Sequence, residues 1–388
     1  MVIRYISAGD RINYGDFLFS LIFHEYFKDK FEIKYYGIVK SNYSYFGGIP
    51  TQSYETLVKN INYEKDVIII GGGEVFFPKW DVLYSYINPY YSFIKKNKYL
   101  NKIEDILNLS KKIFFQTKFS FPFTPNLKIE NLYISVGGKF TNSLNTEEIK
   151  YLINILSKSK FISVRDNRTH FSLNNYGIKS TIIPDSAILM SKIFPLEEII
   201  RRIKNKSLLD INGKYLFLQV GKYLGPKEIK KFVTDVNKIA KDKKLCIVCC
   251  PIGIAPGHED HKLLKQFCKI DPNWILVEPG CIFDVMYLIA KSEFYMGTSL
   301  HGLITAFSFN KLAISLNRRV GKANSFIETW CSDFYETSID YEDLIDKMEI
   351  VFHKWNYSKA KLQLEYCQKL VEDYFIEITT YLTNKLDQ

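Results

Sequence analysis

A histidine between two glycines is the clearest candidate for acid–base chemistry in this sequence. Residues 294–302 have the sequence Phe-Tyr-Met-Gly-Thr-Ser-Leu-His-Gly, in which a strand pattern passes into a helix pattern. His301 should stand at that junction beside Thr298 and Ser299, where a proton-transfer group and free backbone N–H donors for an anion are both available. The alternative is a buried histidine bonded to a carbonyl group, and we favour the functional interpretation. A serine hydrolase is excluded, because the chain has no G-x-S-x-G elbow and Ser-x-His is too rigid for a triad.

A cation for an anionic substrate is expected at the end of another strand. Residues 161–168 end in Arg-Asp-Asn-Arg, so Arg165 could bind a carboxylate or a phosphate through two parallel hydrogen bonds. An ion pair with Asp166 or Asp185 is the structural alternative. Asp185 follows the last strand of this half and could orient Arg165 or position an acceptor.

Three glycines in a row end a buried strand. Gly71, Gly72 and Gly73 precede Glu74 in Val-Ile-Ile-Ile-Gly-Gly-Gly-Glu. Consecutive glycines are costly in conformational entropy, so either a ligand or the next helix must approach this backbone closely, and we favour a ligand. The spacing matches neither a dinucleotide fingerprint nor a P-loop.

The loop after the first expected strand also allows a close backbone approach. It has the sequence Gly-Asp-Arg-Ile-Asn-Tyr-Gly-Asp at residues 9–16, where Gly15 is permissive and Asn13 could cap the following helix. Free N–H groups at a helix start attract an anion, although Asp16 opposes one. A capped turn without a ligand is the alternative.

No metal site is predicted. His-Glu-Asp-His at residues 258–261 offers ligand types, but adjacent residues rarely converge on one ion. Cys246 and Cys249 form a C-x-x-C inside a strand-like run, where side chains alternate between faces. The seven cysteines are odd in number and mostly lie in apolar runs, which indicates reduced thiols in a cytosol.

The elements that must position these residues alternate between short apolar strands and helices, which indicates an α/β protein with parallel sheets. A chain of 388 residues suggests two domains. We expect a first doubly wound domain over residues 1–204 and a second over residues 205–388, with the boundary near the turn signal Asn212-Gly213. The expected strands of the first domain are residues 2–7, 33–37, 67–70, 113–116, 132–136, 161–164 and 181–183.

The second domain repeats the pattern and ends in a helix. Its expected strands are residues 215–220, 245–250, 274–277, 294–296 and 312–316, and its expected helices are residues 227–241, 260–269, 282–290 and 302–309. The tail from about residue 358 should form an amphipathic helix. Residues 78–100 form an aromatic, lysine-rich insert without a clear period.

The net charge of +10 suits an acidic partner, or simply a solvated basic surface, since no dense basic run occurs. No nucleic-acid-binding signature appears. The first residues predict a strand without the apolar core of a signal peptide, and no apolar stretch approaches the length of a membrane span. We expect a cytoplasmic protein that at most touches a membrane. If the acceptor is lipid-linked, residues 80–100 could lie near the membrane with Tyr or Trp rings stacked on sugars, but their composition could equally reflect genomic drift.

The ordered set of motifs resembles the polysaccharide pyruvyl transferase family. The matching motifs are Asn-Tyr-Gly-Asp (residues 13–16), Gly-Gly-Gly-Glu (71–74), Ser-Val-Arg-Asp (163–166), Pro-Asp-Ser-Ala (184–187) and Leu-His-Gly-Leu-Ile-Thr-Ala (300–306). This resemblance implies two facing Rossmann-like domains, similar to GT-B glycosyltransferases, with an anion-binding cleft between them. It also implies transfer of pyruvate from phosphoenolpyruvate to a sugar of a bacterial surface polysaccharide or its lipid-linked precursor as a cyclic ketal, without a cofactor.

One position departs from the family pattern. Members usually carry Arg-Leu-His where this chain has Ser-Leu-His at residues 299–301, and that arginine is thought to hold phosphoenolpyruvate with an arginine like Arg165. Ser299 supplies one neutral hydrogen bond where a guanidinium supplies a charged pair. Arg318, Arg319 and Lys322 are the candidates to replace the missing cation. We assign proton transfer to His301 and acceptor-side shaping to the loops at residues 13–16 and 71–73.

Two other functions keep the same fold. A glycosyltransferase that uses a nucleotide sugar would share the architecture. A catalytically degenerate glycan-binding protein would explain the serine at position 299.

Overall fold

The computed structural model describes residues 1–107, 121–125, 127–140 and 144–387 and divides the chain into two compact units. The first unit comprises residues 1–44, 48–182 and 255–257. The second comprises residues 45–47, 183–254 and the chain from residue 258 onward. The strand expected at residues 113–116 lies outside the described residues.

The first unit is built on a parallel sheet of seven strands in the order β3-β2-β1-β4-β5-β6-β7. The strands are β1 (Ile3–Ile6), β2 (Ile33–Gly37), β3 (Gln52–Ser53), β4 (Val67–Gly71), β5 (Asn131–Val136), β6 (Phe161–Val164) and β7 (Thr181–Ile182). β4 is buried at all five positions, as a continuous apolar run predicts for a central parallel strand. The other strands expected here, apart from residues 113–116, are confirmed to within a few residues.

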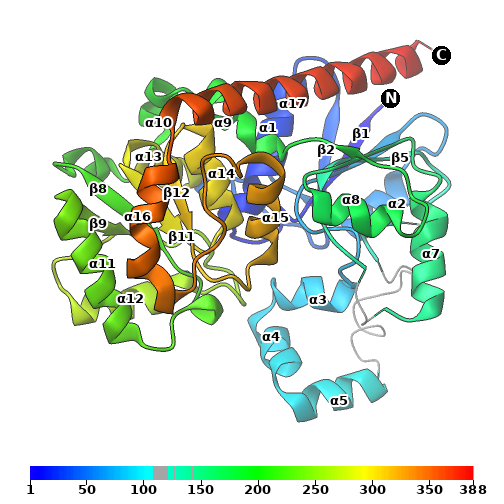
Figure 1. Cartoon of the computed structure of the whole chain (residues 1–388). Helices are drawn as coiled ribbons and strands as arrows, with labels where there is room; N and C mark the ends of the chain where they lie inside the picture. Colours follow the sequence, from blue (N-terminus) through cyan, green and yellow to red (C-terminus); the bar gives the residue numbers. More distant parts are fainter. Residues whose placement is uncertain (108–120, 126, 141–143, 388) are drawn as a thin grey trace. The chain divides into compact units, whose positions relative to one another are not determined.

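The helices of the first unit follow its strands (Figure 1). They are α1 (Tyr14–Phe27), α2 (Tyr54–Asn60), α3 (Trp80–Ser85), α4 (Pro89–Lys96), α5 (Lys98–Leu107), α7 (Thr146–Leu156) and α8 (Asn167–Asn174). The aromatic insert is therefore helical, as α3, α4 and the start of α5. These helices have only six, eight and ten residues, too few turns for a 3.6-residue period to be visible in the sequence.

The second unit has a parallel sheet of five strands in the order β10-β9-β8-β11-β12. The strands are β8 (Tyr215–Gln219), β9 (Cys246–Cys249), β10 (Ile275–Leu276), β11 (Phe294–Gly297) and β12 (Leu312–Ser315). All five expected strands are present at these places. The architecture is thus α/β with two doubly wound sheets, as the sequence predicts.

Nine α-helices of the second unit are described, and the last is the longest (Figure 1). They are α9 (Met190–Ile193), α10 (Leu196–Arg202), α11 (Ile229–Lys243), α12 (Asp260–Ile270), α13 (Ile282–Lys291), α14 (Leu300–Ser308), α15 (Gly321–Trp330), α16 (Leu344–Lys354) and α17 (Tyr357–Leu386). α17 begins within one residue of its expected start and buries an apolar stripe that includes Val371, Phe375 and Ile378.

Apart from residues 45–47, the second unit starts at residue 183, whereas the sequence placed the domain boundary at residues 204 and 205. The connecting segment belongs to the second unit because Asp284 on α13 accepts hydrogen bonds from the backbone N–H groups of Lys204 (2.8 Å) and Asn205 (3.3 Å). Gly213 in the turn signal has no heavy atom within 4 Å of the place of a Cβ, so this turn precedes β8 in open space.

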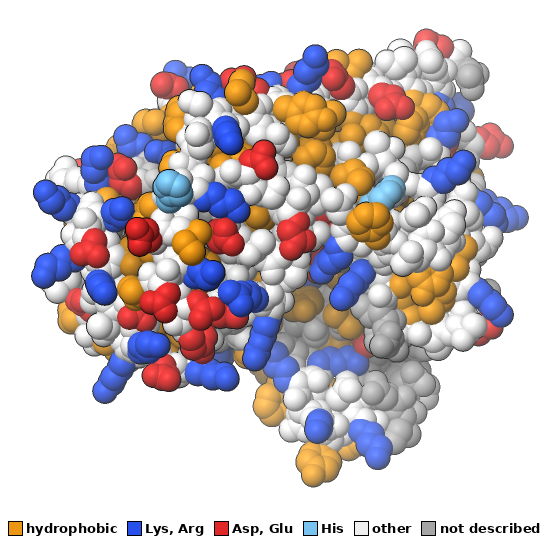
Figure 2. Space-filling view, viewed as in Figure 1, with side chains coloured by type: hydrophobic (Ala, Val, Ile, Leu, Met, Phe, Trp, Pro, Cys, Tyr) orange, Lys and Arg blue, Asp and Glu red, His pale blue; other side chains and the backbone are white. Residues whose placement is uncertain are grey.

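Charged side chains of both signs are interspersed over the face shown in Figure 2. The net charge of +10 is therefore not gathered into one dense basic patch on this face. None of the helices in the described part of the chain is both long and apolar enough to cross a bilayer.

Candidate active site

The strand order of each sheet reverses once, and three of the candidate loops lie at these reversals. In the first sheet the reversal falls between β1 and β4, so the loops that carry Asn13 and Gly72 adjoin it. In the second sheet it falls between β8 and β11, and the turn before His301 follows β11. Ligands of open parallel sheets bind at such switch points, beyond the carboxyl ends of the strands.

Asn13 caps α1, as the sequence predicts. Its side-chain oxygen accepts a hydrogen bond from the N–H of Gly15 at 3.0 Å. Asp16 lies in the first turn of the helix and is half-buried. A carboxylate there interacts favourably with the positive end of the helix dipole and competes with an external anion.

A buried ion pair in the same loop was missed by the sequence reasoning. Asp10 is fully buried and accepts the N–H of Ile38 at 2.6 Å, while its other oxygen pairs with Arg11 at 3.0 Å. The Arg11 guanidinium lies 5.8 Å from the ring centre of Tyr86. The only local signal for a buried arginine here was that Arg11 comes shortly after the first strand.

Protein side chains explain two of the three consecutive glycines. A Cβ at Gly71 would lie 1.8 Å from the Tyr5 hydroxyl, and a Cβ at Gly72 would lie 1.9 Å from the Phe19 ring on α1. Gly72 and Gly73 also have positive φ angles of 67° and 75°. The close approach at Gly71 and Gly72 therefore comes from β1 and α1, not from the helix that follows the glycines, and ligand contact stays a prediction.

Substitution of Gly72 by alanine should lower the free energy of unfolding by about 2–4 kcal/mol, from the collision with Phe19 and the strain of a positive φ angle. Gly213→Ala is the matched control, because Gly213 also has a positive φ angle of 87° but no heavy atom within 4 Å. It should cost only about 1 kcal/mol, the backbone part alone. Equal losses in urea denaturation would show that Phe19 does not restrict this position.

Arg165 follows β6 and is 1% exposed. Its Nε lies 3.8 Å from Asp166 Oδ2, and a Cβ at position 137 would come within 2.9 Å of the same nitrogen, so Gly137 makes room for the guanidinium. Asp166 in turn caps α8 by accepting the N–H and the hydroxyl of Thr169, each at 2.8 Å. The ion pair with Asp166, which was the structural alternative, is therefore present.

Glu74 is exposed and forms an ion pair with Arg168 in the first turn of α8. It also continues the pairing of β4 with β5 through a parallel bridge to Gly137. Glu74 and Arg168 are thus brought together from the ends of different strands, although sequence reasoning gave Arg168 no role.

The turn before His301 is built around a buried tyrosine. A Cβ at Gly297 would lie 2.3 Å from the Tyr295 hydroxyl, and a Cβ at Gly302 would lie 2.5 Å from the Tyr295 ring. The same hydroxyl accepts the N–H of Ser299 at 3.2 Å. The two flanking glycines therefore make room for Tyr295, and burial raises the pKa of this phenol so that it stays protonated.

Ser299 and Thr298 use their hydroxyls to fix this turn. Ser299 Oγ caps α14 by accepting the N–H of Gly302 at 3.3 Å, and Thr298 Oγ1 accepts the N–H of Gly221 at 2.9 Å. Gly221 follows β8, so the Thr298 bond joins the two loops at the switch point of the second sheet. Serine at this position therefore has a structural function that the family comparison alone did not suggest.

Behind the turn lies a polar network that the sequence reasoning missed. Gln219 at the end of β8 contacts the Tyr295 hydroxyl at 3.2 Å and donates to Asp260 Oδ2 at 2.8 Å. The same carboxylate oxygen accepts the N–H groups of Ile252 and Gly253. Burial raises the pKa of Asp260 to about 6, although these N–H donors act in the opposite direction.

The raised pKa of Asp260 should make stability depend on pH. The folded protein holds this proton up to about pH 6 whereas the unfolded chain loses it near pH 4, so the associated stability is present below about pH 4 and lost as the pH rises through 6. The difference in free energy of unfolding between Asp260→Asn and the wild type should therefore change by about 2 kcal/mol between pH 4 and 7. Asp242→Asn, at an exposed position, is the control. The same difference in free energy of unfolding between Asp260→Asn and the wild type at pH 4 and pH 7, measured by urea denaturation, would contradict this expectation.

His301 stands in the first turn of α14 beside a buried carboxylate. His301 is 9% exposed, and its Nε2 lies 3.8 Å from Oδ2 of the fully buried Asp185. Asp185 also caps a short helix by accepting the N–H of Ala187 at 3.1 Å. The sequence gave Asp185 a role beside Arg165 or the acceptor, whereas in the second unit the structure places it next to His301. A carboxylate beside a histidine is an arrangement that can support proton transfer.

The cations proposed to replace the missing arginine lie in different settings. Arg318 is exposed and pairs with Asp343 at 3.3 Å and Asp340 at 3.7 Å. Lys322 is half-buried in the first turn of α15. The charge of Arg318 is thus already balanced by two carboxylates, and the assignment of a replacement cation stays a prediction.

Two of the residues that resemble metal ligands, Glu259 and Asp260, have other partners. Lys262, Tyr223 and Lys222 surround the Glu259 carboxylate, and the Lys262 hydrogen bond is the main cause that lowers its pKa to about 2. In the part of the chain that the structure describes, no cluster of three or more His, Cys, Asp or Glu residues could hold a metal ion. All seven cysteines are free thiols.

Comparison with known proteins agrees with this architecture. The family model of polysaccharide pyruvyl transferases matches residues 13–319. None of the curated proteins matches the chain. Asn13 and the turn before His301 both lie within the matched range.

Several solved structures are similar to this chain over nearly its whole length. UDP-GlcNAc 2-epimerase of Methanocaldococcus jannaschii, solved with UDP-GlcNAc and UDP, is 13% identical, with a TM-score of 0.55 over 98% of this chain and 100% of that one. The UDP-N-acetylglucosamine 2-epimerase of Rickettsia bellii is 11% identical, with a TM-score of 0.57 over 99% and 97%. HepE of Anabaena, solved with UDP-glucose, is 10% identical, with a TM-score of 0.55 over 100% and 99%. At these identities the likeness shows the fold, which is GT-B-like with two Rossmann-like domains.

Proposed function

Because this chain belongs to the polysaccharide pyruvyl transferase family, we propose that it transfers pyruvate from phosphoenolpyruvate to two hydroxyls of a sugar as a cyclic ketal. Family membership makes the protein a transferase that acts on polysaccharide. The donor, the ketal product and the roles of individual residues are the content of the proposal. It is supported most by His301 and Asp185 at the switch point of the second sheet.

Proton transfer to carbon begins the proposed reaction. His301 donates a proton to the methylene carbon of phosphoenolpyruvate, which creates an oxocarbenium-like centre at the neighbouring carbon. A sugar hydroxyl attacks that centre and loses its proton, and the C–O bond to phosphate then breaks. The second hydroxyl closes the ring and releases the second proton, so that methyl, ketal and phosphate account for all the atoms.

Negative charge on the donor requires cations in the site. We assign the donor carboxylate or phosphate to Arg165, whose guanidinium can make two parallel hydrogen bonds, with Arg318, Arg319 and Lys322 as candidates for a second cation. Asp185 stabilises His301 while it is protonated. The loops at residues 13–16 and 71–74 act on the acceptor side.

A direct assay tests this function. The protein is incubated with phosphoenolpyruvate and acceptors that bear galactose, mannose or glucosamine, and phosphate release is measured together with the pyruvate mass increment on the glycan. Thermal shift with nucleoside diphosphates runs in parallel. Stabilisation by nucleoside diphosphates, without stabilisation by phosphoenolpyruvate or any pyruvylated product, would replace the proposal with a glycosyltransferase.

Restoring the usual arginine of the family gives a further test. Ser299→Arg should lower the KM for phosphoenolpyruvate about 10-fold, because a charged hydrogen bond replaces a neutral one. The variant also loses the cap of α14, at about 1 kcal/mol of stability. Ser299→Ala separates the two effects, since it removes the cap and adds no charge. An unchanged KM in the folded arginine variant would show that position 299 does not face the donor.

A further inference from the structure

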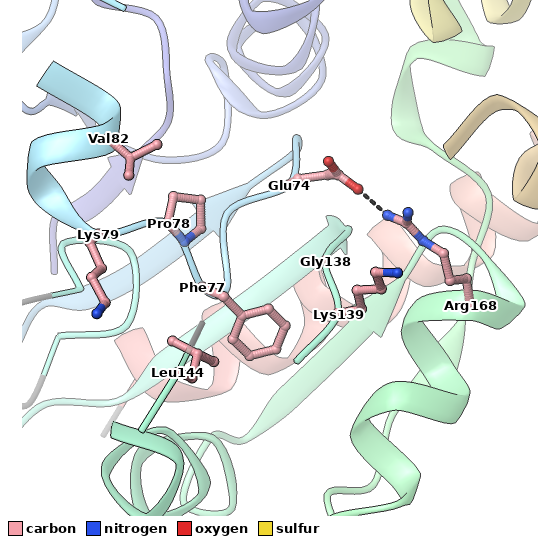
Figure 3. A pocket seen from close by; sticks show the side chains of 9 residues that line it. All are labelled: Glu74, Phe77, Pro78, Lys79, Val82, Gly138, Lys139, Leu144 and Arg168. Atoms are coloured by element: carbon pink, nitrogen blue, oxygen red, sulfur yellow. Dashed lines mark hydrogen bonds and ion pairs between the residues drawn. The ribbon is translucent and has the colours of Figure 1, made fainter. Parts of the chain in front are cut away.

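A pocket of about 420 Å³ lies beyond the carboxyl ends of β4, β5 and β6 in the first unit (Figure 3). Glu74 reaches it from the loop after β4, Gly138 from the loop after β5, and Arg168 from the start of α8. This is the edge at which parallel sheets bind ligands, and the volume falls within the range of small-molecule sites. The pocket therefore has the place and the size of a ligand site.

One side of the pocket is apolar and includes an aromatic ring. Phe77 lines it together with Pro78, Val82 and Leu144. The Phe77 ring packs against the Phe140 ring, with the two ring centres 4.3 Å apart. An apolar ring of this kind suits the C–H face of a pyranose.

Gly138 makes room for this ring. Its φ angle is 143°, and a Cβ at this position would lie 3.1 Å from the Phe77 ring. A side chain at Gly138 would therefore both strain the backbone and press on the ring.

The other side of the pocket is charged. Glu74 and Arg168 form an ion pair there, and the Lys139 side chain extends toward Arg168 (Figure 3). Lys79 is neutralised by Glu148, with Nζ and Oε1 2.7 Å apart. Among the residues that the structure describes, no carboxylate lies within ion-pair distance of Lys139, which is exposed. The pocket therefore keeps a positive charge that an anionic group could balance.

We propose that this pocket binds an acidic sugar unit of the polysaccharide acceptor. The pyranose ring stacks on Phe77, and its carboxylate or phosphate pairs with Lys139. The Glu74–Arg168 pair supplies an acceptor and donors for the hydroxyls. The inference rests on the proposed function, which requires the protein to hold a sugar acceptor.

Binding without donor tests the pocket directly. The probes are the methyl glycosides of glucuronic and galacturonic acid, the matching neutral glucoside and galactoside, and glucose 6-phosphate. Affinities of the full-length protein are measured by saturation-transfer NMR and titration. An acidic sugar should bind about 10-fold more tightly than its neutral counterpart. The two kinds of acidic probe distinguish a carboxylate from a phosphate.

Two variants assign the binding to the pocket. Lys139→Ala should abolish the preference for acidic sugars. Phe77→Leu, which keeps an apolar side chain, should lower the affinity for acidic and neutral sugars alike by about 10-fold. Lys158→Ala removes an exposed lysine that does not line the pocket and should change neither affinity. Thermal unfolding confirms that each variant is folded.

Several results would overturn the inference. They are no binding by any probe, a preference for acidic sugars that survives Lys139→Ala, and displacement of the sugars by phosphoenolpyruvate, which would make this a donor site. Failure of the proposed function would look different. If no pyruvate is transferred but sugar binding depends on Lys139 and Phe77, the proposed function fails and the inference of a sugar-binding pocket holds. If transfer occurs and neither variant changes the acceptor KM, only the pocket inference fails.

Discussion

Replacing His301 with glutamine is expected to lower the rate of pyruvyl transfer by about 10²- to 10⁴-fold, the usual contribution of a positioned acid–base group. Glutamine keeps hydrogen-bonding capacity but cannot carry the proton to carbon. The neighbouring carboxylate predicts a smaller loss for Asp185→Asn, because His301 then loses the charge 3.8 Å from its Nε2. Phosphate release at saturating phosphoenolpyruvate and acceptor measures both variants.

A histidine outside the site controls for general effects. His353 is exposed on α16 of the same unit, so His353→Gln should keep the wild-type rate. Glycan and phosphoenolpyruvate binding to His301→Gln should persist, since the loss lies in the chemical step. Residual activity of His301→Gln within about threefold of the wild type would remove the histidine from the mechanism, because a positioned proton-transfer group contributes far more.

Arg165→Met should affect both stability and donor binding. The substitution removes the guanidinium 3.8 Å from Asp166 Oδ2, where both side chains are almost fully buried. Removing one partner of a buried ion pair costs about 3–5 kcal/mol in free energy of unfolding, because the other charge stays in a site of low polarity. Urea denaturation measures this loss, and titration with phosphoenolpyruvate measures donor binding.

Arg165→Lys separates the two contributions. It keeps the positive charge near Asp166 but loses the planar fork, so stability should recover more than donor affinity does. Arg201→Met is the control for an exposed pair, since Arg201 is 75% exposed beside Glu198, and such pairs contribute less than about 1 kcal/mol. If Arg165→Met lowered the free energy of unfolding no more than Arg201→Met does, the buried ion pair would not stabilise the fold.

The local signals in the sequence predicted the elements well. A four-residue apolar run predicts the central strand β4, and Asn13 predicts the start of α1, because strand burial and helix capping depend on neighbouring residues. The same local patterns failed for α3 and α4, which are too short to show a period. They also placed the domain boundary about twenty residues late, since a turn signal does not tell which unit a segment contacts.

By itself, the sequence determined that His301 stands at the start of a helix after a strand, that Arg165 ends another strand, and that the motifs fit one family. Tertiary structure decided what surrounds these residues. Tyr295 fills the space at the two glycines of the turn, Asp185 lies beside His301, and Asp260 contacts Gln219 from 41 residues away. Strand order in the folded sheet sets these contacts, whereas periodicity and turn chemistry act only over a few residues, so no local pattern could have predicted them.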